Sequence, residues 1–371
     1  MIVTFRADAA LQIGAGHVMR CLTLADELKS IGVDCHFITR CQPGSLEKLI
    51  VTRGHHLHLL PHLDCKNSAS DVSTPQMKCA AGLAHEHWLL GGWKNDAEEC
   101  RSILHAIDTD WLVVDHYGID ERWESALTDV THHMMVIDDL ADRRHQCDVL
   151  LDQNLNRQAA DYDGLVPHGC RRLIGPEYAL LRQEFRGYRE QSLKRREHAG
   201  LHHILVNLGG VDQDNVTGRV LTALGKAELP PDIHLTIVMG QSAPWVKEVT
   251  SQAASLQWRA EVLVGVSNMA EIMAMSDLAI GAAGSTSWER CCLGVPCILT
   301  ILAENQRLIA QSLENGGAAK AMEIDRLEDE LGPLILTLAD NPDQLSFMAT
   351  HAAAMVDGRG ATRVVDALVR G

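Results

Sequence analysis

A histidine stands at the predicted start of the first helix, directly after a glycine loop. The apolar run 2–5 predicts a short strand, and residues 18–28 carry apolar side chains at helical spacing. Between the two lie Gly14, Gly16 and His17. Ligands of open α/β sheets bind beyond the carboxyl ends of strands, and helix N-termini attract anions, so we expect His17 to lie at a ligand. A histidine that only caps or packs the helix is the alternative, and the loop alone leaves both interpretations open.

A second glycine loop follows the predicted strand 278–280 and contains Gly284, Ser285 and Thr286. Consecutive backbone N–H groups at a helix N-terminus can hold a diphosphate without lysines. Glu289 follows within one helical turn, and its carboxylate could accept hydrogen bonds from both hydroxyls of a ribose. An ordinary capped helix with a solvent-facing glutamate is the alternative interpretation.

Two series of alternating strands and helices must position these residues. The second series opens with a strand that leads into Gly209 and Gly210, a weaker candidate for phosphate approach. The stretch 186–200 is rich in charge and poor in apolar residues, so it is predicted to be a linker. We therefore expect an α/β protein with an N-terminal domain over 1–190 and a C-terminal domain over 200–371.

The composition narrows the class of protein. The chain has 371 residues, of which 46% are apolar, so it can bury ample core. Lys and Arg total 33 against 49 Asp and Glu, and the net charge of −16 argues against a broad nucleic-acid-binding surface. No signal-peptide pattern and no apolar run near the roughly 20 residues of a membrane span are present. We expect a cytoplasmic protein without a membrane span.

Cysteine and histidine usage bears on redox state and metals. The 11 cysteines are an odd number scattered over the chain, which argues against a secreted disulfide framework. Histidines and cysteines cluster in two regions, but without CxxC or HExxH spacing, so we predict no metal site. The clusters are His55, His56, His58 and His62 with Cys65, and His85 and His87 near Cys79.

Several motifs resemble the UDP-2,4-diacetamido-2,4,6-trideoxy-β-L-altropyranose hydrolase family of pseudaminic acid biosynthesis. In the N-terminal half these are Arg6-Ala7-Asp8, Ile13-Gly14-x-Gly16-His17-x-Met19-Arg20-Cys21, Val114-Asp115-His116-Tyr117, Asp138-Asp139, Asp152-Gln153-Asn154 and Leu173-Ile174-Gly175-Pro176-Glu177-Tyr178. The C-terminal half is similar both to that family and to the peptidoglycan N-acetylglucosaminyltransferase. Its motifs are Leu208-Gly209-Gly210, Gly284-Ser285-Thr286-x-x-Glu289 and Asn305-Gln306.

The resemblance implies a GT-B architecture, with two Rossmann-like domains facing each other across a cleft, and inverting hydrolysis of a UDP-sugar without metal or cofactor. His17 resembles the family's general base. The implied substrate-binding residues are Arg6, Asp8, Gly14, Gly16, Arg20, Tyr117, Asn305 and Gln306. The implied nucleotide-binding residues are Gly209, Gly210, Asn268, Met269, Gly284, Ser285, Thr286 and Glu289. The stretch 61–92 departs from the family pattern, and the oligomeric state stays open.

Two other functions fit the same architecture. A GT-B glycosyltransferase would pass a UDP-linked amino sugar to an acceptor, and a non-catalytic protein of polysaccharide assembly would only bind the nucleotide sugar. Fold does not separate these functions. The N-terminal set Arg6, Asp8, His17 and Tyr117 favours the hydrolase, as does the lack of an apolar segment for docking on a membrane.

Overall fold

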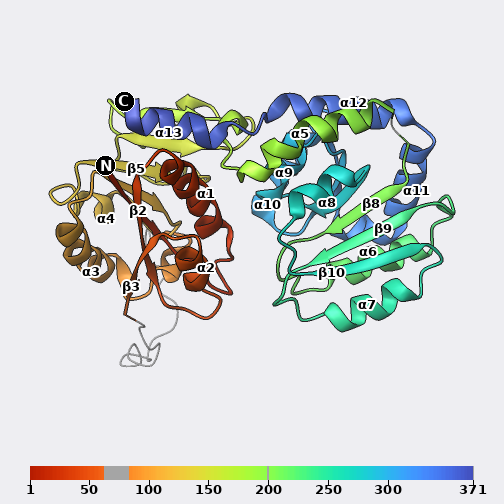
Figure 1. The fold of residues 1–371 in the computed structure, drawn as a ribbon, viewed down its shortest axis with the longest axis horizontal. Helices are drawn as coiled ribbons and strands as arrows, with labels where there is room; N and C mark the ends of the chain where they lie inside the picture. Colours follow the sequence, from red (N-terminus) through yellow and green to blue (C-terminus); the bar gives the residue numbers. More distant parts are fainter. Residues whose placement is uncertain (62–82, 199, 371) are drawn as a thin grey trace, which may run out of the picture. The chain divides into compact units, whose positions relative to one another are not determined.

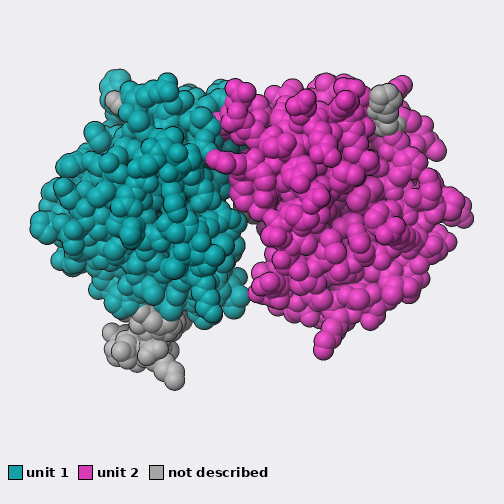
Figure 2. Space-filling model, in the orientation of Figure 1, with its two compact units in different colours: residues 1–180, 361–371 teal, residues 181–360 magenta. Residues whose placement is uncertain are grey.

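The computed structural model describes residues 1–61, 83–198 and 200–370, which form two compact units (Figure 1). Unit 1 comprises Met1–Leu180 with Ala361–Gly371, and unit 2 comprises Leu181–Gly360 (Figure 2). Each unit is built on a sheet whose strands all pair in parallel. The predicted α/β class is therefore confirmed.

The sheet of unit 1 has seven strands in the order β3-β2-β1-β4-β5-β6-β7. The strands are β1 (Ile2–Ala7), β2 (Asp34–Arg40), β3 (His56–Leu60), β4 (Trp111–Asp115), β5 (His133–Ile137), β6 (Val149–Asp152) and β7 (Arg171–Ile174). Its helices are α1 (Gly16–Ser30), α2 (Glu47–Thr52), α3 (Gly92–Ile107), α4 (Glu121–Ser125) and the C-terminal α13 (Gly360–Arg370).

Both faces of this sheet are covered by helices. Phe5 and Phe37 stack at 4.8 Å between ring centroids in a core shared with α1, α2 and α13. On the other face, Leu112 and Val114 pack with residues of α3 and α4. Because both faces are buried, the central strands are apolar along their length, which is why runs such as Trp111–Asp115 are recognisable in the sequence.

Unit 2 carries a six-stranded sheet in the order β10-β9-β8-β11-β12-β13. The strands are β8 (His203–Asn207), β9 (His234–Met239), β10 (Arg259–Val264), β11 (Leu278–Ala282), β12 (Cys297–Ile301) and β13 (Ala319–Glu323). The helices are α5 (Gln183–Arg195), α6 (Val216–Gly225), α7 (Val246–Ala254), α8 (Met269–Met275), α9 (Thr286–Cys292), α10 (Glu304–Asn315), α11 (Leu327–Ala339) and α12 (Pro342–Met355).

Residues 186–195 of the predicted linker belong instead to the helix α5, which packs on unit 2. Its charged side chains bind groups of that unit: Arg189 donates to the carbonyl of Ala353 at 2.8 Å, and Arg195 pairs with Asp277 at 2.5 Å. The charged side chains that suggested solvent exposure thus form hydrogen bonds and ion pairs that hold α5 on unit 2. The boundary between the two units falls between residues 180 and 181, and α13 belongs to unit 1. These units differ in their bounds from the expected domains 1–190 and 200–371.

Within the described residues, no helix combines the length and the apolar character that a membrane span requires. Most of the stretch 61–92, including His62, Cys65 and Cys79, lies outside the residues that the structure describes.

Candidate active site

His17 lies at the carboxyl end of the sheet of unit 1, where β1 and β4 are neighbours. From β1 the chain continues to β2 on one side, while β4 pairs with β1 on the other side. The strand order therefore reverses between β1 and β4, and ligands of such sheets bind at the carboxyl ends of the strands at this switch point. His17 is the second residue of α1 and is 7% exposed. Its Nδ1 is 2.6 Å from Oδ1 of Asp115, the last residue of β4. The predicted place of His17 at a helix start is confirmed.

The carboxylate of Asp115 is buried and held from both sides. Arg20 donates to it through two nitrogens, Nε at 2.5 Å and Nη2 at 2.6 Å. Burial raises the pKa of Asp115, but the charges of Arg20 and His17 outweigh burial and bring the pKa below its ordinary value. An ionised Asp115 accepts the hydrogen of Nδ1, which leaves Nε2 of His17 as the nitrogen that can take a proton.

Arg20 also connects this pair to a tyrosine. Its Nη1 is 2.6 Å from Oδ2 of Asp139, the second residue after β5, and the Tyr117 hydroxyl donates to the same oxygen at 2.6 Å. Burial and then the charge of Asp139 raise the pKa of Tyr117, so its hydroxyl stays protonated. The rings of His17 and Tyr117 meet edge to face at 4.6 Å. Side chains from β1–α1, β4 and β5 thus form one connected set.

An aromatic wall, Trp88 and His85, borders the same ring. Trp88 stacks on Tyr117 with centroids 5.8 Å apart and planes 19° apart, and it lies 6.4 Å from the His17 ring. His85 packs against Trp88 at 4.4 Å. Both residues come from the end of the stretch 61–92, whose role the sequence did not indicate. Aromatic faces beside a catalytic candidate are suited to the apolar face of a sugar.

Arg6 and Asp8 are buried in an ion network rather than presented to solvent. Arg6 donates to Asp8 at 2.6 and 2.9 Å and to Asp96 at 2.7 and 3.1 Å. Asp8 also accepts from the Arg40 amide at 2.8 Å. Burial lowers the pKa of the adjacent His116 to about 4, so this imidazole is neutral. The network braces the end of β1, and the predicted contact of Arg6 and Asp8 with substrate stays a prediction.

The loop before α1 leaves open space. Gly14 has φ +82°, which favours glycine, and its amide donates to the Ala10 carbonyl at 2.8 Å. A Cβ built on Gly14 or Gly16 would meet no atom of the described chain within 4 Å. Among the described residues, no side chain caps the N-terminus of α1, and the first turn of the helix carries no acidic residue. A ligand could therefore approach the helix start beside His17.

In unit 2, the second glycine loop follows β11 as predicted and leads into α9. Beneath it lies Arg290, which is 1% exposed and donates through Nη2 to the Ala282 carbonyl at 2.6 Å and to Thr286 Oγ1 at 3.2 Å. Ser285 is exposed, and no side chain in the described part of the chain caps α9. The loop therefore offers its N–H groups above a buried positive charge, an arrangement that suits an anion.

Glu289 lies one turn into α9 and faces Arg182 of the same unit. Its Oε1 is 3.7 Å from Arg182 Nη2. Burial raises the pKa of Glu289 to about 7, although the charges of Arg182 and Arg290 act to lower it. The arginines do not fully offset the cost of burying the Glu289 carboxylate, so further hydrogen-bond donors would stabilise its ionised form. The hydroxyls of a ribose would supply such donors.

The loop after β8, unlike the loop with Gly284, leads into a helix whose first amides already have hydrogen-bond partners. Gly209 has φ +102°, but the helix that follows is already capped by the protein. Asp212 accepts from the amides of Val216 at 2.8 Å and Thr217 at 2.9 Å. These amides are therefore unavailable to a phosphate, and the loop with Gly284 is the better anion site. A nucleotide contact of Gly209 and Gly210 stays a prediction.

The remaining predicted residues occupy helix starts in unit 2. Asn268 is the N-cap residue of α8, and its side-chain amide donates to Glu271 at 2.8 Å, while Met269 is buried. The Gln306 side-chain carbonyl accepts from the Leu302 amide at 3.2 Å. Asn305 is the second residue of α10 and directly precedes Gln306, but its side chain lies outside the described residues. Ligand contacts of these residues stay predictions.

Comparisons with known proteins agree with this architecture. Residues 203–364 match the model of the glycosyltransferase family 28 C-terminal domain. The chain is 26% identical over 317 residues to the UDP-2,4-diacetamido-2,4,6-trideoxy-β-L-altropyranose hydrolase of Campylobacter jejuni, covering 85% of this chain and 97% of the relative. The predicted resemblance is confirmed. A chain from Sorangium cellulosum described as a UDP-N-acetylglucosamine transferase of undecaprenol-linked muramyl pentapeptide is 39% identical over 115 residues, 29% of this chain and 28% of its own.

Solved structures support the fold. The crystal structure of MurG from Acinetobacter baumannii matches with a TM-score of 0.68 and 17% identity, covering 100% of this chain and 99% of that chain. The UDP-GlcNAc 2-epimerase of Neisseria meningitidis, solved bound to UDP-GlcNAc, matches with a TM-score of 0.60 and 11% identity over 100% of both chains. The predicted GT-B fold is confirmed.

Proposed function

We propose that this protein is an enzyme that hydrolyses a UDP-linked 2,4-diacetamido-2,4,6-trideoxy sugar at its anomeric carbon, releasing UDP and the free sugar. The observation that carries the proposal is the His17–Asp115 pair at the switch point of unit 1, with a contact of 2.6 Å. The resemblance to the Campylobacter hydrolase over 85% of the chain supports the choice of substrate. Such a product would serve the biosynthesis of pseudaminic acid for bacterial surface glycans.

The proposed reaction needs one base and one leaving group. A water oxygen attacks C1 of the sugar from the face opposite UDP, and Nε2 of His17 takes a proton from that water. The bond between C1 and the β-phosphate oxygen breaks, and its electrons leave with UDP, so the anomeric configuration inverts. Asp115 stabilises the imidazolium that forms, because it is ionised and hydrogen-bonded to Nδ1. Neither a covalent enzyme intermediate nor a metal ion is required by this scheme.

Unit 2 is assigned the UDP part of the substrate. The amides of the loop Gly284–Thr286 would bind the diphosphate above the buried guanidinium of Arg290, and Glu289 would accept from the ribose hydroxyls. The structural match to an epimerase bound to UDP-GlcNAc supports a UDP-sugar as ligand. Stabilisation of departing UDP by these groups would contribute to the rate as well as to binding.

A glycosyltransferase is the second candidate, because residues 203–364 match the C-terminal domain of glycosyltransferase family 28. Such an enzyme would use the same nucleotide site and replace water with the hydroxyl of an acceptor. The two functions therefore differ in whether a sugar acceptor is needed for UDP release.

The deciding assay follows UDP release from the diacetamido UDP-sugar in ¹⁸O-labelled water without any acceptor. We expect UDP release, with ¹⁸O appearing at C1 of the free sugar and none in UDP, and we expect the same rate after treatment with EDTA. UDP release that requires an added acceptor would support the transferase. ¹⁸O found in UDP would place cleavage at phosphorus, and a loss of activity in EDTA restored by Mg²⁺ would contradict metal independence.

We expect Trp88→Ala to lower kcat/KM about 3- to 10-fold, mainly through KM, because a stacking contact with the sugar contributes about 0.5–1.5 kcal/mol. Trp88→Phe keeps an aromatic face and should retain most activity. Steady-state kinetics with the UDP-sugar, beside titration with UDP alone, provides the measurement. If both variants weakened UDP binding and left KM for the sugar substrate unchanged, Trp88 would not contact the sugar.

A further inference from the structure

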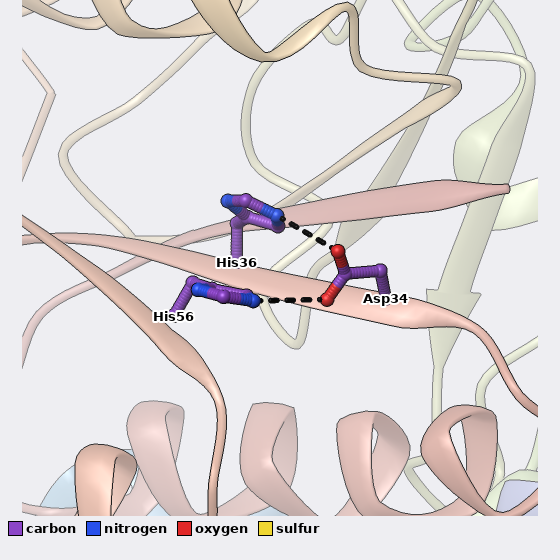
Figure 3. Close-up of side chains that lie close together, drawn as sticks. All are labelled: Asp34, His36 and His56. Carbon is purple, nitrogen blue, oxygen red and sulfur yellow. Dashed lines mark ion pairs between the residues drawn. The ribbon is translucent and has the colours of Figure 1, made fainter.

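A cluster of one aspartate and two histidines lies at the starts of β2 and β3. The candidate active site lies at the opposite, carboxyl ends of the strands. Asp34 is the first residue of β2 and His56 the first of β3, and His36 is two residues into β2. In Figure 3 the imidazoles of His36 and His56 both point at the carboxylate of Asp34. The cluster plays no part in the proposed hydrolysis. Motif spacing predicts no metal site at His56, because its neighbours in the cluster come from another strand and are brought close only by strand pairing.

The parallel register brings these side chains to one face of the sheet. His36 and His56 are paired across β2 and β3, and Asp34 lies two residues before His36, which is the repeat of side chains on one face. Their imidazoles stack with centroids 4.5 Å apart. His55 belongs to the opposite face and contacts Asp26 at 2.9 Å, so it is not part of the cluster.

The spacing of the potential ligand atoms fits a small cation. Nε2 of His36 is 3.5 Å from Oδ2 of Asp34, and Nε2 of His56 is 3.2 Å from Oδ1. One ligand atom from each of the three residues lies within 4.8 Å of the others. Tetrahedral zinc with bonds of about 2.0–2.1 Å places its ligand atoms about 3.3 Å apart. The two distances to Asp34, 3.5 and 3.2 Å, lie on either side of that spacing.

A third histidine, His58, orients one of the proposed ligands. His36 Nδ1 lies 3.0 Å from Nε2 of His58, so one hydrogen is shared between the two rings. When Nδ1 carries that hydrogen, Nε2 presents its lone pair toward Asp34, which is the tautomer that a metal requires. The buried Nε2 of His36 has no hydrogen-bond partner in the described chain.

We propose that Asp34, His36 and His56 bind a zinc ion whose fourth ligand is water, with His58 as the partner that orients His36. Two imidazoles and one carboxylate suit zinc better than Mg²⁺ or Ca²⁺, which prefer oxygen ligands. The side chains of Asp34 and His56 are 54% and 61% exposed, so the ion can enter from solvent. Because β3 is the edge strand, the ion would tie that edge to β2. The proposal does not depend on the proposed hydrolysis.

The test is calorimetric titration of the metal-free full chain with Zn²⁺, beside thermal unfolding with and without the ion. We expect saturable binding and a higher Tm with Zn²⁺. Asp34→Asn and His56→Asn should each raise the Kd more than about 100-fold, whereas His58→Asn, which removes only the orienting partner, should raise it about 10- to 100-fold. UDP release should be unchanged in all three variants.

His133→Asn is the matched control. His133 also begins a strand of the same sheet, is 56% exposed and lies 3.8 Å from Asp148. Among the described residues, however, this pair belongs to no group of three with metal-ligand spacing. We expect its zinc affinity to equal that of the unchanged chain. Cobalt substitution adds a second measurement, because a site of nitrogen and oxygen ligands gives visible d–d bands without sulfur-to-cobalt charge transfer. Zinc binding that persists in the double variant Asp34→Asn/His56→Asn, or a charge-transfer band from cysteine, would overturn the proposal.

Discussion

Replacing His17 with asparagine is expected to lower kcat at least about 100-fold with little change in UDP affinity, because general-base catalysis commonly contributes 10²- to 10⁴-fold. Asparagine can still donate to Asp115 but cannot take a proton from water. The 2.6 Å contact with an ionised Asp115 is the physical reason to assign the base to this ring. Single-turnover rates with the UDP-sugar and calorimetry with UDP measure the two quantities separately.

Asp115→Asn tests the same assignment from the other side of the contact. An amide in place of the carboxylate can hold the wrong imidazole tautomer and leaves the imidazolium unstabilised, so kcat should fall strongly as well. Arg20 also loses a bidentate partner, so circular dichroism and thermal unfolding must accompany the kinetics. His133→Asn controls for loss of a histidine in the same unit. Near-normal turnover of His17→Asn would reduce His17 to a structural residue.

The order of strands and helices follows largely from apolar runs, because parallel strands buried on both faces are apolar throughout. β4 is such a run, and its five residues, Trp111–Asp115, are all buried. β7 is harder to recognise in the sequence, since it begins with Arg171 and Arg172 and has only four residues. The same holds for β13, because Lys320 and Glu323 interrupt its apolar pattern. Both are edge strands, where one-sided burial weakens the signal.

The candidate site shows a similar limit. The position of His17 was predictable, because a glycine loop and a helix start are local features. Its contact with Asp115 spans 98 positions, and only the order of β1 and β4 in the sheet brings the two together. The polar residues that end β4 and β5 were the available signal for Asp115 and Asp139. No local sequence feature indicates that Trp88 lies near the His17 ring. None indicates that Arg290 lies under the glycine loop that contains Gly284.

Glu289→Ala is expected to raise the dissociation constant for UDP about 10- to 150-fold, since removing a charged hydrogen-bond partner costs about 1.5–3 kcal/mol. The proposed ribose contact predicts this loss with no sugar present. Calorimetry should be done near pH 8, because the pKa of Glu289 is raised to about 7 by burial and the carboxylate is the form that accepts from both hydroxyls. Glu289→Gln keeps the volume and one acceptor, and should lose less.

Tyr117→Phe provides the counterpart in unit 1. It removes the hydroxyl that donates to Asp139 at 2.6 Å, beside the His17 ring, and we expect lower turnover of the UDP-sugar with nearly unchanged UDP binding. The pair of variants therefore tests which unit binds which part of the substrate. If Tyr117→Phe abolished UDP binding and Glu289→Ala spared it, the nucleotide would belong to unit 1. The proposed division, with the sugar and base in unit 1 and UDP in unit 2, would then be reversed.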